Sequence, residues 1–205
     1  MAKIKERKRE ADVACFHEFA VSDWKVFFGN VLMFITCAFY LAWWAVAFWP
    51  KGGGNNSLAA FLITGAILAG IAAIVALSLG IVSLPRVTKG VPVSLIPLAA
   101  IALYIVSLFV TKTLFHRPMT SEILVMFVWF AVECAAIAAL NLSGRFGTGQ
   151  TVLLSFLVVF ATCVGLVCYV LYYRLDGFPS FWDGFIPLAV DAIVVAVFLS
   201  VQATS

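Results

Sequence analysis

The chain has 205 residues, of which 64% are hydrophobic and only 11% are charged, and its mean hydropathy is +1.10. Soluble domains are about half apolar and about a quarter charged, and a fold of this length could not bury so much apolar surface in a core of its own. The composition therefore excludes a soluble domain and predicts an all-α integral membrane protein, with the lipid bilayer around its apolar surface.

The net charge of +3 comes largely from a basic N-terminal segment, which contains Lys3, Lys5, Arg7, Lys8 and Arg9. Basic residues just before a first membrane helix hold that end in the cytoplasm, so we expect no nucleic acid partner. Residues 1–24 are predicted to form a basic cytoplasmic tail. Within it, Glu10–Trp24 has apolar residues at helical spacing, which predicts a short amphipathic helix lying on the membrane interface.

Six apolar segments follow, each long enough to cross about 30 Å of hydrocarbon, which takes about 20 residues. Turn-forming sequences rich in Gly, Pro, Asn and Ser separate them. Residues 25–205 are therefore predicted to form one six-helix transmembrane domain, with spans at 25–49, 58–84, 91–115, 122–142, 151–173 and 181–202.

The orientation follows from the Lys and Arg residues in the connecting segments and near the ends of the spans. With the N-terminus inside, nine of them fall on the cytoplasmic side, and four fall outside: Lys51, Lys112, Arg117 and Arg174. This bias favours a topology with both termini in the cytoplasm. We expect a multi-pass protein of the cell membrane, which in a bacterium is the cytoplasmic membrane.

Short sequence motifs in the first half of the chain recur in the second half. Ile96-Pro-Leu-Ala99 near the start of the third span matches Ile186-Pro-Leu-Ala189 in the sixth, and Leu32-Met-Phe34 resembles Val125-Met-Phe127. A duplication of three spans would leave this pattern and would invert the second half, as in many transporters. Chance agreement between apolar segments is the alternative.

Small residues recur at helical spacing in the second span, at Gly65, Ala69 and Ala73. In membranes such residues let helix backbones approach closely. This pattern predicts a packing seam, either within the chain or between copies in a homo-oligomer.

Two acidic residues lie inside predicted spans, Glu133 in the fourth and Asp191 in the sixth. In the six-span topology both lie near the midplane, where a carboxylate costs at least a few kcal/mol unless it is protonated, hydrated or paired. No Lys or Arg lies at matching depth. Three roles stay open: binding a cationic or polyhydroxylated solute, taking and releasing protons, or joining helices as protonated hydrogen-bond donors.

Three aromatic residues form a second tier of candidates. Tyr40 and Tyr104 are central in their spans and could partner the acids. Trp129 precedes Glu133 by one turn on the same face and could stack on a ligand. Simple packing is the alternative role for each of them.

Several kinds of chemistry find no support in the sequence. There is no GxSG-type nucleophile motif, no Lys in the last span for a retinal Schiff base, and no histidine within any span. The five cysteines form no CxxC pair. We therefore expect no catalytic residue, no enzyme activity, no cofactor and no metal site.

The first functional interpretation is a transporter or channel for a small solute or ion, with a midplane site at the two acids. The chain length, six spans, cytoplasmic termini and the Ala38-x-x-x-Ala42 step are similar to the substrate-binding subunits of energy-coupling-factor vitamin transporters. This resemblance implies a multi-component uptake system with partner membrane subunits. A third interpretation is a non-transporting assembly factor, sensor or structural partner.

Overall fold

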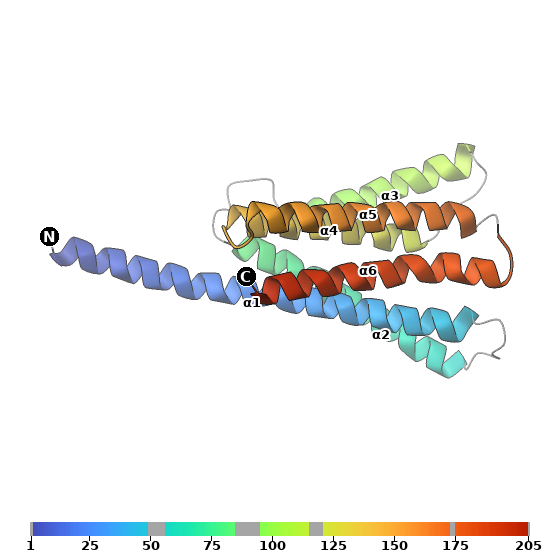
Figure 1. Cartoon of the computed structure of the whole chain (residues 1–205), viewed down its shortest axis with the longest axis horizontal. Helices are drawn as coiled ribbons and strands as arrows, with labels where there is room; N and C mark the ends of the chain where they lie inside the picture. The colour runs from blue at the N-terminus through green and yellow to red at the C-terminus, as the bar shows by residue number, and fades with distance from the viewer. Residues whose placement is uncertain (1, 49–55, 85–94, 115–120, 173–174, 205) are drawn as a thin grey trace.

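A computed structural model describes residues 2–48, 56–84, 95–114, 121–172 and 175–204. All regular structure in these ranges is helical, which confirms the predicted class. Consecutive helices run in opposite directions along one axis (Figure 1). The helices are α1 (Ala2–Phe48), α2 (Asn56–Ser83), α3 (Leu95–Leu114), α4 (Ser121–Leu142), α5 (Thr148–Tyr172) and α6 (Phe178–Thr204).

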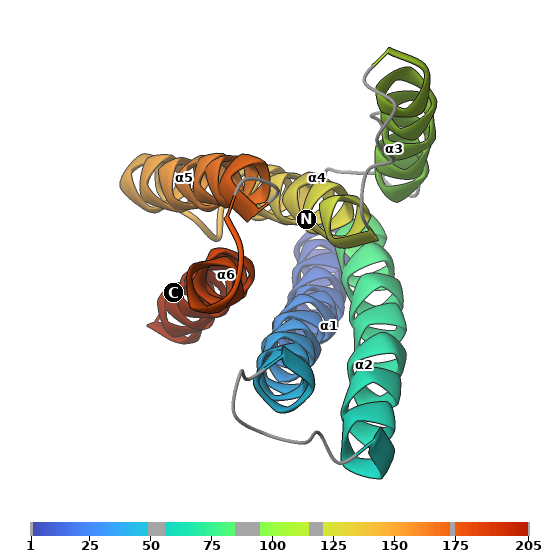
Figure 2. The ribbon, with the colours of Figure 1, turned by 90° about the vertical axis from the view of Figure 1, so that its right-hand side faces the viewer.

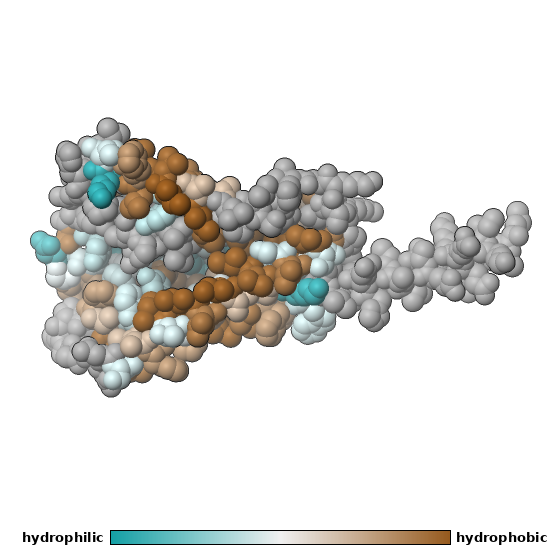
Figure 3. All heavy atoms as spheres, turned by 180° about the vertical axis from the view of Figure 1, so that it is seen from behind, coloured by the Kyte–Doolittle hydropathy of each residue, from teal (hydrophilic) through white to brown (hydrophobic). Residues whose placement is uncertain are grey.

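Four helices are long and apolar enough to cross a membrane. The qualifying segments are Asp23–Phe48 of α1, Ser57–Ser83 of α2, Thr148–Tyr172 of α5 and Phe178–Thr204 of α6. The apolar parts described for α3 and α4 are shorter, Ala99–Val110 and Met126–Leu142. In Figure 3, apolar surface covers the middle of the visible face and polar residues lie towards its two ends, which is compatible with a membrane protein.

Two names identify the ends of the bundle. The Arg145 end contains the connection between α4 and α5 and the C-terminal end of α6. The Trp44 end contains the C-terminal end of α1 and the start of α6 (Figure 1).

The packing order of the helices explains where the core lies. α1 packs against α2 and α6, α4 packs against α2, α3 and α5, and α5 packs against α6. α3 lies at the edge of the bundle beside α4, as the view along the axis shows (Figure 2). The apolar core includes fully buried side chains from five helices: Val26, Leu77, Ile81, Ile137, Leu140, Leu154, Val158, Val195 and Phe198.

The closest approach between helices is the contact of α1 with α2. A Cβ atom added to Gly80 would lie 2.8 Å from the backbone nitrogen of Val26, and one added to Gly29 would lie 2.9 Å from the backbone nitrogen of Leu77. Since no real Cβ atom fits at these distances, each helix presents a glycine to the backbone of the other.

The small-residue seam predicted on α2 is used within the chain. A Cβ atom at Gly65 would lie 3.4 Å from the ring of Phe39 on α1, and Ala73 is fully buried. Ala69 is half-buried.

The N-terminal segment corrects one prediction. Residues 1–24 were expected to contain a separate interfacial helix, but α1 runs without a break from Ala2 to Phe48 and continues past the bundle along its axis (Figure 1). No Gly or Pro occurs between Ala2 and Phe28. Because Ala, Lys, Glu and Arg are strong helix formers, nothing in this stretch ends the helix.

The turn between α4 and α5 is set by local backbone chemistry. Gly144 has φ of +81°, and the amides of Arg145 and Phe146 donate to the carbonyl of Leu140 at 3.0 and 3.2 Å. A glycine in the left-handed conformation ends many helices in this way. α5 begins three residues before the predicted start because the Gln150 side chain accepts a hydrogen bond from the Gly147 amide at 2.9 Å, which caps the helix.

α6 also begins three residues earlier than predicted, at Phe178. Gly177 has φ of +71°, and Pro179 occupies the first turn, where a missing N–H costs nothing. Pro187 lies inside the helix, in the second half of its N-terminal three turns. The predicted turns at 50–57, 85–90 and 116–121 fall almost entirely outside the described residues.

Candidate functional site

Glu133 is the most deeply buried charged side chain in the described ranges. It lies near the middle of α4 and is 1% exposed. Neither carboxylate oxygen has a hydrogen-bond partner among the described residues. A buried polar atom usually has such a partner, because burying it alone costs several kcal/mol in hydrocarbon. Glu133 therefore needs a proton, an ion or another ligand.

Asp191 lies near the middle of α6 and is half-buried. Its charge acts on Glu133, so the fold brings the two predicted acids into one region between α4 and α6. When two carboxylates share an apolar region, it is energetically favourable for them to bind a proton or a cation between them.

Cys37 is a third member of this region, from α1. It is 8% exposed, and the charges of both acids act on it. This cysteine has no predicted role in the sequence analysis, because nothing in the sequence indicates that it lies near the two acids. In the part of the chain that the structure describes, no three His, Cys, Asp or Glu side chains are placed to hold a metal ion together.

The aromatic candidates separate into three cases. Trp129 lies one turn before Glu133, is 3% exposed, and its indole Nε1 is buried with no hydrogen-bond partner in the described ranges. Tyr40 on α1 stacks on Trp43, with ring centroids 5.1 Å apart. Tyr104 is half-exposed and lies on α3, which packs against α4 at the edge of the bundle.

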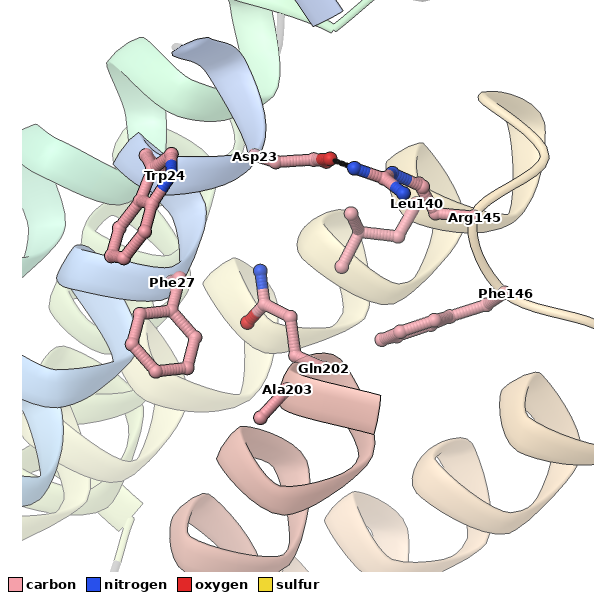
Figure 4. A pocket seen from close by; sticks show the side chains of 8 residues that line it. All are labelled: Asp23, Trp24, Phe27, Leu140, Arg145, Phe146, Gln202 and Ala203. Carbon is pink, nitrogen blue, oxygen red and sulfur yellow. Dashed lines mark hydrogen bonds and ion pairs between the residues drawn. The ribbon is translucent and has the colours of Figure 1, made fainter. Parts of the chain in front are cut away.

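At the Arg145 end, an ion pair joins α1 to the turn after α4. Arg145 donates to the Asp23 carboxylate, and the left-handed Gly144 turns the chain so that this contact can form. The pair lines a pocket of about 410 Å³ between α1, α4 and α6 (Figure 4). The other lining residues are Trp24, Phe27, Leu140, Phe146, Gln202 and Ala203.

A buried amide pair lies at the same end. Asn30 is 0% exposed, and its Nδ2 donates to Oε1 of Gln202 at 3.3 Å, which joins α1 to α6. Asn30 Oδ1 and Gln202 Nε2 are both buried without a hydrogen-bond partner in the described ranges. Nothing in the sequence indicates this pair, because its members are 172 positions apart.

The Trp44 end is closed by aromatic side chains. Trp44 is 5% exposed, and its Nε1 donates to the backbone carbonyl of Phe181 at 3.1 Å. Its indole also lies directly against Gly184, where a Cβ atom would clash with it. The ring of Phe181 stacks on that of Phe185, with centroids 5.8 Å apart.

The sequence matches no known protein family, and no curated protein or solved structure is similar enough to count as a match. The functional assignment therefore rests on the site itself. Its central feature is a buried carboxylate without a partner beside a second carboxylate.

Proposed function

We propose that the protein is a membrane transporter or channel for a small solute or ion, and that it holds a cation or a proton at Glu133 and Asp191. The observation that carries this proposal is the state of Glu133, which is buried, has no partner on either oxygen, and lies within electrostatic reach of Asp191. Intramembrane acids of this kind mark ion pathways and proton relays.

The charges around the site favour a cation or a proton over an anion. The ion pair of Arg145 with Asp23 lies at the Arg145 end of the bundle. No Lys or Arg occurs in the sequence at the depth of the acids. Since a cluster of three metal-binding side chains is not found in the described residues either, a proton, a monovalent cation or an organic ammonium suits the site better than a transition metal.

The alternative, in which the acids only hold helices together, has weaker support. A protonated carboxylic acid that joins two helices must donate a hydrogen bond to an acceptor on the other helix. Neither oxygen of Glu133 has a partner among the described residues. A structural role would therefore leave its burial without compensation.

We further propose that all six helices cross the cell membrane with both termini in the cytoplasm. α3 and α4 run alongside the four long apolar helices (Figure 1), and the charge bias of the sequence favours this orientation. The proposed inverted repeat would pair α1 with α4 and α3 with α6. In such a repeat the pair α1–α6 corresponds to the pair α4–α3, and both pairs pack together, which supports it. The pairs α2–α3 and α5–α6 also correspond, but α5 and α6 pack far more extensively than α2 and α3.

Flux through proteoliposomes tests the function. Purified protein would be reconstituted with a trapped pH-sensitive dye under an imposed potassium diffusion potential, with and without external Na⁺ or methylammonium. We expect Glu133→Gln and Asp191→Asn each to lower flux by about tenfold or more, because each removes a charge from an apolar site. Asp176→Asn is the matched control, since Asp176 is an exposed acid outside α5 and α6.

Flux in the folded double variant equal to that of the wild type would rule out the proposal. A wild-type protein with no flux under any condition, together with acid variants that only melt earlier, would favour the structural alternative.

A further inference from the structure

Buried polar atoms without partners in the described ranges occur on α1, α4 and α6, the three helices that line the pocket at the Arg145 end. They are Asn30 Oδ1 on α1, Gln202 Nε2 on α6, and Trp129 Nε1 and both Glu133 oxygens on α4. Outside this group, Asp183 Oδ2 lies at the Trp44 end. Polar atoms buried in a protein usually bind each other, ordered water or a ligand. Two of these atoms, on Asn30 and Gln202, lie on the pocket side of the acids, where a polar path to the acids would need them.

Helical spacing aligns these groups along the bundle. Asn30 and Cys37 are seven residues apart on α1, which is about two turns or 10 Å. Asp191 and Gln202 are eleven residues apart on α6, which is about three turns or 16 Å. Residues at these spacings share one helix face, so the amide pair and the acid region lie on the same sides of α1 and α6.

The amide pair also belongs to the pocket. Gln202 lines the pocket with its side chain directed between Phe27 and Leu140, and it accepts the hydrogen bond of Asn30 (Figure 4). Asp23 and Arg145 contribute one negative and one positive charge to the same wall. These two charges neutralise each other, and the amide pair places further polar atoms on the inner side of the pocket.

Access to the acids is unequal at the two ends. At the Trp44 end, the indole of Trp44 lies against Gly184 and is held by Phe181. At the Arg145 end, the pocket reaches as far as Gln202. Beyond the amide pair, the apolar side chains of Met33 and Phe198 are buried, and they must move before an ion can pass.

From this arrangement we infer that the pocket at the Arg145 end is the access route to Glu133 and Asp191, and that Asn30 and Gln202 are positioning residues that conduct a cation or proton along it. The inference rests on the proposed function. It adds a direction of access and two residues outside the acid pair. Both amides keep one polar atom available for the passing species or its hydration water.

Cys37 provides a built-in probe, because it is buried beside both acids. A protein that keeps Cys37 as its single thiol, with the remaining cysteines replaced by Ala, would be reconstituted in liposomes. A membrane-impermeant cationic methanethiosulfonate would be added from one side at a time. The thiolate attacks the reagent sulfur, a mixed disulfide forms and methanesulfinate leaves, and mass spectrometry follows the modified fraction.

We expect Cys37 to be modified faster from the Arg145 end. Asn30→Leu and Gln202→Leu should each slow this reaction by about tenfold, the effect of losing one buried polar partner. Asn30→Ser, which stays polar and leaves room for water, should retain most of the rate. Asn141→Leu is the matched control, because Asn141 also makes an interhelical hydrogen bond, to Thr151 at 2.8 Å, away from the pocket.

Three results would overturn the access route: no modification from the Arg145 end, faster modification from the Trp44 end, or an equal effect of Asn141→Leu and Asn30→Leu. If Asn30→Leu lowers folded yield, the half-buried Gln202 gives the same test. Loss of flux in Glu133→Gln with unchanged labelling in Asn30→Leu would reject the route and keep the proposed function. Slower labelling in Asn30→Leu with full flux in Glu133→Gln would reject the proposed function instead.

Discussion

Gly184 is a residue at which one added methyl group meets a buried aromatic side chain. Ala at this position would place a methyl group inside the indole of Trp44. Overpacking of this kind costs about 1–3 kcal/mol, so we expect Gly184→Ala to lower the melting temperature in detergent. The aromatic packing at the Trp44 end would also loosen, which faster labelling of Cys37 from that end would reveal.

Gly149 supplies the contrast to Gly184. It lies in the first turn of α5, and nothing lies within 4 Å of a Cβ atom added there. We expect Gly149→Ala to change the free energy of unfolding by no more than about 0.5 kcal/mol, which is usual for surface substitutions. An equal loss of stability in both variants would contradict the contact with Trp44 as its cause, because the higher helix propensity of Ala by itself would raise stability.

The ion pair of Asp23 and Arg145 predicts a measurable coupling between two distant segments. The side chains are 17% and 35% exposed, respectively, so solvent screens the pair and we expect a coupling of about 0.5–1 kcal/mol. A double-mutant cycle of Asp23→Asn and Arg145→Gln, measured by unfolding in mixed micelles, gives this value. Arg145 makes further interactions, so Arg145→Gln should cost more than Asp23→Asn. Strict additivity would show that the pair contributes nothing.

Individual residues differed in how well the sequence identified them. Glu133 and Asp191 stood out because an acid in an apolar segment needs no structural knowledge to be recognised. Cys37, Asn30 and Gln202 could not be found in this way. A cysteine or amide is common in such segments, and its importance depends on which residues of other helices it meets.

At the scale of the helices, the contact between α1 and α2 depends on two glycines. We expect Gly29→Ala and Gly80→Ala to lower stability by about 1–3 kcal/mol, because each added methyl meets the backbone of the other helix and cannot be accommodated by a rotamer change. Gly65→Ala should cost less, since its nearest neighbour is the ring of Phe39 at 3.4 Å. Unfolding followed by tryptophan fluorescence would rank the three, and the reverse order would contradict the proposed backbone contact.

The positions of the helices were predictable and some of their ends were not. Long apolar segments located all six helices. The starts of α5 and α6 depend on the Gln150 side chain at Gly147 and on the positive φ of Gly177, which are local details that hydropathy ignores. The uninterrupted α1 was predicted incorrectly, because a change from polar to apolar residues was interpreted as a boundary between helices.

For the whole molecule, the side on which each loop lies can be measured directly. In a cysteine-free background, Thr113→Cys, Gly149→Cys and Asp176→Cys would be labelled in intact cells with an impermeant maleimide. With six spans and cytoplasmic termini, Thr113→Cys and Asp176→Cys should react, and Gly149→Cys should react only after the membrane is permeabilised. Thr113 and Gly149 both on the cytoplasmic side would reduce the number of spans to four.

The glycine contacts of α1 with α2 also bear on the order in which the protein assembles. These two helices precede the others in the chain, and their contact at Gly29 and Gly80 needs no residue from α3 to α6. Contacts between neighbouring segments form quickly, so a hairpin of α1 and α2 can be complete while the rest of the chain is still being synthesised. α4 and α6, which contain the two acids, then pack on a finished apolar surface, and their carboxylates need not remain in lipid until a partner helix arrives.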